Sequence, residues 1–383
     1  MHSKSNKPIV KGVRWASTAA GIKAAGNGAA PLDLALMEVA AGSTLAAVFT
    51  RNAFAAAPVQ VALQNLAKLR AAAHQQAIYC LVNAGNANAG TGSAGIDAAR
   101  SSCEQAATQL AVPASAVLPF STGVIGEPLP LAKIEAALPG LAGSLSASGW
   151  DDAARAIMTT DTVPKCRSYE LDIDGVRIGL SGIAKGAGMI KPNMATMLAF
   201  VATDAAIDQA DLDALLQQAV NCSFNRITVD GDTSTNDACV LAASGAAGLQ
   251  LQPQTPAWQA LQQAVRTLLT ELATDIIRDA EGASKFITID VCGGASSDEC
   301  LQVGYAVAES PLVKTAFFAS DANWGRILAA IGRAGVEQLD IARVEIMLAD
   351  YCICSGGGRV AGYDEDRAAE IMAQPEITLT INL

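Results

Sequence analysis

The segment KPNMATMLAF, residues 191–200, places one hydroxyl residue, Thr196, between a polar Lys-Pro-Asn start and an apolar run. The chain has only two histidines, His2 next to the terminus and His74 in the Ala/Gln-rich stretch AAAHQQA. A Ser-His-Asp triad and a histidine zinc site are therefore nearly excluded. A hydroxyl nucleophile in this chain needs another base.

A threonine at the start of a chain carries its own base, because its α-amine can activate its hydroxyl. The reference pKa of an α-amine, roughly 7.7–8.0, is close to the operating pH, where a general base works best. Thr196 is internal, so this chemistry requires cleavage of the Ala195–Thr196 bond. Pro192 favours extended backbone at Lys191, and the small Ala195 leaves its carbonyl open to attack. The alternative is an ordinary threonine at the start of a strand, which the residues alone favour.

Other motifs that could bind cofactors do not fit. NAGNANAGTG lacks the Lys-Ser/Thr ending of a P-loop, and AKGAGMIK has Lys191 where a dinucleotide fingerprint needs glycine. VDGDTSTND resembles a calcium loop at Asp230 and Asp232, but Thr235 and Leu241 occupy its glycine and glutamate positions. We therefore expect neither a metal nor an organic cofactor.

Composition narrows the class of protein. The 383 residues are 51% hydrophobic and 4% aromatic, enough for about two to three units of domain size. The net charge of −11 makes nucleic acid and anionic membranes poor partners. There is no apolar run of the roughly 18–20 residues that a membrane span needs, and no secretory signal. Nine scattered cysteines without a C-x-x-C motif predict buried, reduced thiols and a cytoplasmic location.

Alternating strand and helix patterns would position these residues. A buried strand is expected at 78–85, a helix over 95–110 and a hairpin at 169–180 around Asp174-Gly175. Thr255 and Pro256 should cap and start a helix that continues to about Asp279. VEIMLADYCI and EITLTINL are expected to be late strands, and Cys352 and Cys354 lie in a strand-like stretch. The predicted class is α/β, an α+β sandwich of mixed sheets layered with helices.

The segment SGIAKGAGMIKPNMATML resembles the self-cleavage segment of the ornithine acetyltransferase (ArgJ) family. The resemblance extends nearly end to end, through GIKAAG, VFTRNAFAAAPV, LVNAGNANAGTG, PFSTGVIGEPLP, IMTTDTVPK, VDGDTSTND, SPLVKTAFF and NWGRILAAIGRAG. It implies a DmpA- and ArgJ-like fold and self-cleavage between Ala195 and Thr196. The products would be an alpha chain of residues 1–195 and a beta chain of residues 196–383, assembled as an α2β2 heterotetramer.

The resemblance also implies roles for residues that look ordinary by themselves. Thr122 and Gly123, which could form a simple turn, would make the oxyanion hole through a hydroxyl and a backbone N–H. Lys185, in a glycine-flanked loop, would meet the substrate carboxylate rather than solvent. Thr159 would bind substrate, with Thr160 a weaker candidate. Glu281, otherwise a charge at a helix end, would meet the side-chain amine of ornithine. The Asp230–Asp237 run and the Asn323–Arg326 loop are assigned to supporting structure near the site.

The implied reaction transfers acetyl from N2-acetylornithine to L-glutamate, giving ornithine and N-acetylglutamate through a ping-pong acetyl-Thr196 intermediate. Acetyl-CoA is a second acetyl donor for part of the family, and the sequence does not decide whether this chain uses it. Two alternative functions stay open. One is an N-terminal-nucleophile amidohydrolase or aminopeptidase that passes acyl groups to water, and the other is a non-catalytic assembly subunit that would fail to self-cleave.

The end of the printed sequence adds one expectation. Relatives continue past EITLTINL into a segment that supplies an asparagine and a serine or threonine to the substrate pocket, and neither position is carried over here. For these 383 residues we expect normal self-cleavage but poor acetyl transfer with a raised share of hydrolysis.

Overall fold

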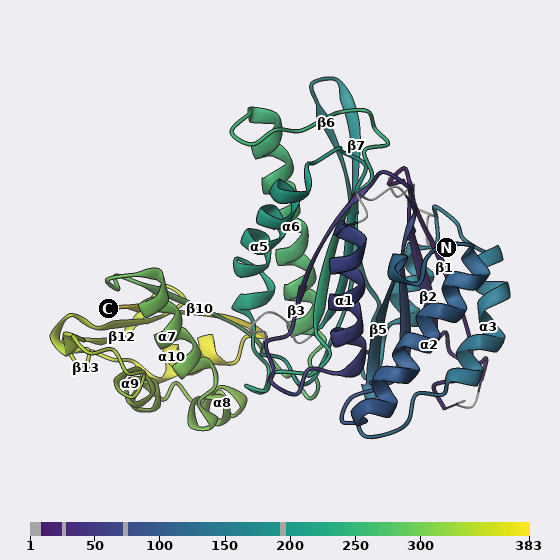
Figure 1. Cartoon of the computed structure of the whole chain (residues 1–383). Coiled ribbons are helices and arrows are strands. Elements are labelled where there is room, and N and C mark those ends of the chain that lie inside the picture. Colours follow the sequence, from purple (N-terminus) through teal and green to yellow (C-terminus); the bar gives the residue numbers. More distant parts are fainter. Residues whose placement is uncertain (1–8, 25–27, 72–75, 192–196) are drawn as a thin grey trace. The chain divides into compact units, whose positions relative to one another are not determined.

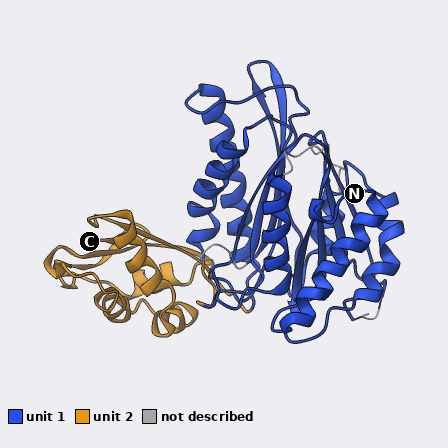
Figure 2. Ribbon diagram, in the orientation of Figure 1, with its two compact units in different colours: residues 1–227, 232–281 blue, residues 228–231, 282–383 orange. Residues whose placement is uncertain are grey.

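The computed structural model describes residues 9–24, 28–71, 76–191 and 197–383 (Figure 1). The chain forms two compact units, one of residues 1–227 and 232–281 and the other of residues 228–231 and 282–383 (Figure 2). Both contain sheets and helices, so the predicted mixed α/β class is confirmed.

The first unit contains two sheets. The four-stranded sheet has the order β1-β2-β4-β5, and its strands are β1 (Val13–Thr18), β2 (Leu34–Val39), β4 (Ile78–Asn86) and β5 (Val117–Val124). The five-stranded sheet has the order β3-β9-β8-β7-β6, and its strands are β3 (Thr44–Phe49), β6 (Lys165–Ile173), β7 (Val176–Lys185), β8 (Leu198–Thr203) and β9 (Ala238–Ala243). Every residue of β8 and β9 is buried, as expected for apolar strands at the centre of a layered sheet.

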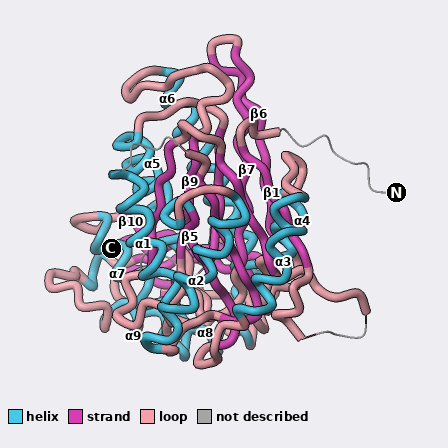
Figure 3. The backbone as a smooth tube through the Cα atoms, turned by 45° about the vertical axis from the view of Figure 1, so that its right-hand side comes forward, coloured by secondary structure: helices cyan, strands magenta, loops and turns pink. Residues whose placement is uncertain are grey.

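Helices cover the outer faces of both sheets (Figures 1 and 3). The helices of this unit are α1 (Ala57–Ala71), α2 (Gly92–Leu110), α3 (Leu131–Gly143), α4 (Trp150–Ala156), α5 (Gln209–Asn221) and α6 (Pro256–Arg278). α2 and α3 pack on the four-stranded sheet, and α5 and α6 on the five-stranded sheet. Between the sheets, the ring of Phe200 makes edge contacts with Trp15 and Phe120 at centroid distances of 5.6 and 5.0 Å. This shared core fixes one sheet against the other.

Local sequence features form the elements that were predicted from them. The strand at 78–85 is β4, and the helix over 95–110 is α2. β6 and β7 form the predicted hairpin, with positive φ at both Asp174 (52°) and Gly175 (77°), as a tight hairpin turn requires. α6 begins at Pro256, and its N-cap Thr255 accepts a hydrogen bond from the Trp258 N–H at 3.1 Å. These predictions are confirmed.

The second unit is a five-stranded sheet of order β10-β14-β11-β12-β13 with its own apolar core. Its strands are β10 (Phe286–Cys292), β11 (Glu345–Leu348), β12 (Tyr351–Ser355), β13 (Gly358–Arg359) and β14 (Glu376–Asn382). Its helices are α7 (Ser297–Ala308), α8 (Pro311–Phe318), α9 (Trp324–Gly332) and α10 (Glu365–Met372). EITLTINL forms β14 as predicted. VEIMLADYCI is not one strand, because it turns at Ala349 (φ 50°) into the antiparallel pair β11 and β12.

The cysteine prediction was partly wrong. Four thiols are buried, those of Cys80, Cys103, Cys239 and Cys354, whereas Cys222 and Cys292 are exposed. No disulfide joins any of the nine cysteines, all of which are among the described residues. Cys222 follows the last turn of α5 and Cys292 ends β10, where a side chain faces solvent. Among the described residues, no helix is long and apolar enough to cross a membrane.

Candidate active site

Thr122 and Gly123 lie near the end of β5, within the strand rather than in a turn. Gly123 has φ 134°, and a Cβ atom built on it would lie 2.3 Å from the carbonyl carbon of Gly85 in β4. Only glycine fits this close approach between parallel strands. The same bare backbone leaves Gly123 exposed at the edge of the sheet, beside the buried Thr122. We call Thr122 and Gly123 the oxyanion pair, after the role that the sequence resemblance implies for them.

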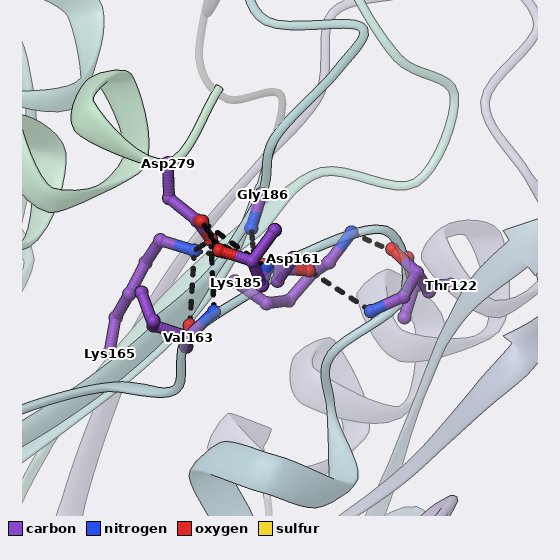
Figure 4. A network of polar contacts seen from close by, with 9 residues as sticks. Thr122, Asp161, Val163, Lys165, Lys185, Gly186 and Asp279 are labelled. Carbon is purple, nitrogen blue, oxygen red and sulfur yellow. Dashed lines mark hydrogen bonds and ion pairs between the residues drawn. The ribbon is translucent and has the colours of Figure 1, made fainter. Parts of the chain in front are cut away.

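Lys185 is the last residue of β7, not part of a loop as the sequence suggested. Its side chain is 8% exposed, and its Nζ donates to the Thr122 Oγ1 at 3.2 Å, joining the two sheets (Figure 4). Because the lysine occupies an acceptor position of this oxygen, the hydroxyl hydrogen is left to donate to another group. Burial lowers the pKa of Lys185, and the carboxylates of Asp161 and Asp237 oppose that shift.

Asp161, which the sequence analysis missed, connects Lys185 to Thr159. Its Oδ1 accepts from the Gly186 N–H at 2.7 Å, and its Oδ2 accepts from the Thr159 N–H at 3.0 Å. Burial acts to raise the pKa of Asp161, but the ammonium groups of Lys185 and Lys165 outweigh it and the pKa is lowered. Asp161 is therefore a buried anion that fixes the segment carrying Thr159 against the end of β7.

A second buried lysine completes this network. Lys165 Nζ lies 2.7 Å from Asp161 Oδ1 and 2.7 Å from Asp279 Oδ2, with the lysine side chain 1% exposed. Figure 4 shows Asp161, Lys165 and Asp279 grouped together, while the Lys185 side chain points to Thr122. The pairing ties the start of β6 to the end of α6. The only sign of this network in the sequence is the close spacing of Asp161 and Lys165, because Asp279 is distant along the chain.

Glu281 follows the end of α6 and is exposed. Its N–H donates to the Ala187 carbonyl at 2.9 Å, so it lies against the loop that follows Lys185. A Cβ atom on Gly188 would lie 2.8 Å from the Glu281 carboxyl, and the missing side chain makes room for that group. Glu281 also has an electrostatic influence on Lys185.

The structure thus brings together five of the predicted site residues: Thr122, Gly123, Thr159, Lys185 and Glu281. Thr160 is exposed beside Thr159. Ala195, Thr196 and both histidines lie outside the described residues. Met197 is the first described residue after these positions, and the register of β7 and β8 pairs Leu198 directly with Lys185. The chain that follows Thr196 therefore starts beside this lysine.

Comparisons with known proteins point to one family. The chain matches the ArgJ family over residues 14–383. It is 51% identical to the arginine biosynthesis bifunctional protein ArgJ of Pseudomonas syringae pv. tomato, over 98% of this chain and 90% of that protein. The chain belongs to the ArgJ family. It is also 55% identical to the ArgJ protein of Methylococcus capsulatus, over 98% of this chain and 89% of that protein.

A solved structure of Mycobacterium tuberculosis ornithine acetyltransferase, complexed with ornithine, also matches this ArgJ-family chain. The identity is 36%, with a TM-score of 0.40 and coverage of 49% of this chain and 94% of that chain.

The ArgJ-family motif NWGRILAAIGRAG lies in the second unit, where its described contacts are structural. Asn323 caps α9 by accepting from the Arg326 N–H at 3.2 Å. The Arg326 guanidinium donates to the Leu312 carbonyl and the Thr315 hydroxyl, both at 2.9 Å, which fastens α8 to α9.

Proposed function

We propose that this ArgJ-family chain is a glutamate N-acetyltransferase of arginine biosynthesis that cleaves itself before Thr196 and uses Thr196 as its nucleophile. Acetyl would move from N2-acetylornithine to L-glutamate through an acetyl-Thr196 ester. Family membership supports the enzyme class, and the contact between Lys185 and Thr122 is the observation that carries the site.

That contact supports the proposal because of where it lies. Thr122 lies near the end of a strand of one sheet, and Lys185 ends a strand of the other. Leu198, two residues after Thr196 in the sequence, pairs with Lys185. A cation, a hydroxyl donor and a glycine N–H therefore converge at the edge where the beta chain would begin. Acyl transfer needs such donors around the developing oxyanion.

Self-cleavage would proceed in two steps. Thr196 Oγ bonds to the carbonyl carbon of Ala195, the Ala195–Thr196 C–N bond breaks, and the hydroxyl proton passes to the released amine. Water then hydrolyses the ester, leaving a carboxylate on Ala195 and a free hydroxyl and α-amine on Thr196. The oxyanion pair would stabilise the tetrahedral species of both steps.

Acetyl transfer would reuse the freed groups. Thr196 Oγ attacks the acetyl carbonyl of N2-acetylornithine, the amide C–N bond breaks, and the Thr196 α-amine carries the hydroxyl proton to the leaving ornithine amine. The amine of glutamate then attacks the ester, N-acetylglutamate departs, and a proton returns to Thr196 Oγ. Both half-reactions use one nucleophile, which makes the mechanism ping-pong.

Substrate recognition would use the charged residues on each side of the Gly186–Gly188 loop. Lys185 would meet the α-carboxylate, Glu281 the side-chain ammonium of ornithine, and Thr159 a further polar group of the substrate. The two charges lie beside the same short loop, because Lys185 directly precedes Gly186 and the Glu281 N–H donates to the Ala187 carbonyl. A zwitterionic amino acid with a second amine requires two such opposite charges. The proposed mechanism uses no resident cofactor, and whether acetyl-CoA serves as a second acetyl donor is left to experiment.

The proposed alpha and beta chains would stay joined after cleavage. β7, before the cleavage point, pairs with β8, after it, over six residue pairs from Leu180↔Thr203 to Lys185↔Leu198. β3 of the alpha chain likewise pairs with β9 of the beta chain. We propose an α2β2 assembly in the cytoplasm.

Acetyl transfer to glutamate tests this function directly. The purified protein is incubated with N2-acetylornithine, with and without glutamate, and N-acetylglutamate and free acetate are measured. The proposal expects glutamate-dependent N-acetylglutamate. Release of acetate alone, unaffected by glutamate, would indicate an N-terminal-nucleophile hydrolase instead. A parallel assay with acetyl-CoA decides whether the enzyme is bifunctional.

A further inference from the structure

Two adjacent side chains, Asn236 and Asp237, end the polar run that leads into β9. Both are buried, at 7% and 2% exposure, although both are polar. The sequence analysis grouped them only as supporting structure near the site. Their contacts reach the two sheets separately, and each side chain has one contact to a residue that adjoins a proposed catalytic residue in the sequence.

Asn236 holds the peptide that leads into the oxyanion pair. Its Nδ2 donates to the Ser121 carbonyl at 2.9 Å and to the Ala87 carbonyl at 2.6 Å. Its Oδ1 accepts from the Thr235 hydroxyl at 2.8 Å. Ser121 directly precedes Thr122, so this amide fixes the end of β5 where the oxyanion pair lies.

Asp237 holds the peptide that follows the nucleophile. Its carboxyl accepts from the backbone N–H of Met197. The carbonyl of Met197 accepts from the Ala238 N–H at 3.0 Å. Met197 directly follows Thr196, so its N–H and its C=O are both held by consecutive residues of this segment.

The same segment also holds the other described flank of residues 192–196. Thr233 Oγ1 donates to the Lys191 carbonyl at 2.9 Å, and Ile190 pairs with Thr233. Lys191 and Met197, the described residues on either side of the proposed cleavage site, therefore both contact residues 233–238.

The Asp237 carboxyl is costly to the fold. Among the described residues its Oδ2 has no hydrogen-bond partner, although it is buried. Burial raises the pKa of Asp237 well above its ordinary value, against the hydrogen bonds of Ser234 and the Lys185 ammonium. A group that weakens the fold in this way is typical of functional sites rather than of packing.

We propose that Asn236 and Asp237 are a positioning pair that holds the end of β5, where the oxyanion pair lies, in register with Met197, the described residue next to the proposed nucleophile. This inference rests on the proposed function, because it takes Thr196 as the nucleophile. Asn236 holds Ser121, which precedes Thr122, and Asp237 holds Met197, which follows the proposed nucleophile in the sequence. Since the two side chains are neighbours on one backbone, the two catalytic groups from different sheets cannot shift independently. A displacement of about 1 Å at a reacting group can cost on the order of 100-fold in rate.

Each residue of the positioning pair has a matched control. Asn65 contacts the opposite end of β5, and Asp204 lies at the opposite end of β8. Asn65 of α1 is 8% exposed and donates its Nδ2 to the Val117 carbonyl at 2.8 Å, at the start of β5. Asp204 is 1% exposed, follows the end of β8, and accepts from the Gly179 N–H at 2.8 Å. These residues make the same kinds of bond far from the strand ends that carry the site.

The experiment compares Asn236→Ala and Asp237→Ala with Asn65→Ala and Asp204→Ala in the full chain. The readouts are kcat and KM for acetyl transfer, the first-order rate of self-cleavage, and Tm. We expect kcat and the cleavage rate to fall at least tenfold in the two positioning variants, with KM for acetylornithine changed less than threefold. Both controls should lose comparable Tm and keep kcat within twofold.

Conservative variants keep the test decisive if an alanine variant fails to fold. Asp237→Asn retains an oxygen that accepts from the Met197 N–H, so it should recover most of the kcat lost in Asp237→Ala. Asn236→Ser, a milder change, should show a smaller fall in kcat than Asn236→Ala. Equal kcat in positioning and control variants of matched Tm would overturn the inference. So would an Asp237→Asn variant as slow as Asp237→Ala.

Thr196→Ala separates this inference from the proposed function. An inactive, uncleaved Thr196→Ala together with normal Asn236 and Asp237 variants would refute only the positioning pair. A cleaved or active Thr196→Ala would refute the proposed function itself, and the positioning pair with it.

Discussion

Strand β8 has a buried aspartate beside each end, and the two aspartates are bonded differently. At its far end, Asp204 accepts from the N–H groups of Gly179 and Lys11, one on each carboxylate oxygen, at 2.8 and 3.3 Å. At its near end, Asp237 has one oxygen without a partner among the described residues and lies under the influence of the buried Lys185. The carboxyl group at the far end of β8 therefore has a hydrogen-bond donor for each oxygen, whereas the one at the near end does not.

The difference teaches where chemistry is expected in an otherwise well-packed sheet. Both ends have the same strand neighbours and the same residue type, so strand pairing does not explain the contrast. What distinguishes the near end is the convergence of a lysine, a hydroxyl and a carboxyl that are not fully satisfied by one another. Such groups weaken the fold and remain available to a substrate.

The largest expected effect separates Thr203, the last residue of β8, from Thr196, which precedes β8 by two residues in the sequence. Thr196→Ala should leave the chain uncut and lower acetyl transfer on the order of 10⁴-fold or more, as loss of a catalytic nucleophile does. Thr203→Ala removes a hydroxyl that accepts from the Ala205 N–H at 3.3 Å, and should still be cleaved and active. Gel analysis and steady-state assays of both variants check this. Equal activity in the two would remove the distinction between the ends.

The next effect compares the two buried lysines. Lys165→Met should destabilise the protein by about 3–5 kcal/mol, because it leaves the carboxylates of Asp161 and Asp279 buried without their cation. Lys185→Met removes a cation whose pKa is lowered by burial, so it should cost far less stability while raising KM for acetylornithine. Urea unfolding gives both free energies. A larger stability loss for Lys185→Met would contradict this comparison.

A somewhat smaller effect is expected at the oxyanion pair. Thr122→Val removes the hydroxyl that contacts Lys185 while keeping the shape of the side chain, and should lower kcat on the order of 10²–10³-fold. Its control is Thr203→Val, a buried threonine at the far end of β8. The account is weakened if both variants keep kcat and differ only in Tm.

The smallest effect concerns stability against pH. Burial raises the pKa of Asp204 and, by more, that of Asp237. Above about pH 4 the unfolded carboxyl is ionised while the folded one still binds its proton, so stability falls as pH rises toward the folded pKa. Relative to Asp204→Asn, the wild type should lose about 1.4 kcal/mol of unfolding free energy for each unit by which folding raises the pKa of Asp204.

Urea unfolding over a pH series measures this effect. The stability difference between the wild type and Asp237→Asn should grow over a wider pH range than the difference between the wild type and Asp204→Asn. Parallel stability curves for all three proteins would mean that neither carboxyl is shifted in the folded state.

Local patterns predicted much of the fold. The Asp174-Gly175 hairpin and the Thr255-Pro256 helix start could be predicted because each depends on neighbouring residues. The sequence could not place Lys185 at a strand end, since glycines on either side of a lysine look like a loop. It also joined β11 and β12 into one strand, because Ala349 carries no turn signal although its φ is positive.

The site was predicted only in part. Thr122, Lys185 and Glu281 came from the family resemblance, and the structure gathers them. Asp161 is only four residues from Lys165, but that spacing alone does not distinguish a buried ion pair from two surface charges. Asp279 was missed because its partner Lys165 lies 114 residues away, and long-range ion pairs leave no pattern along a chain. The positioning contacts of Asn236 were invisible for the same reason, since its partners lie in β5 and after β4.

The central claim is that Thr196 becomes the first residue of a new chain, and N-terminal sequencing of the purified protein tests it most directly. The account predicts a second start that reads Thr-Met-Leu-Ala, from a fragment of residues 196–383 that copurifies with residues 1–195. A single uncut chain, or a second start at any other residue, would contradict it.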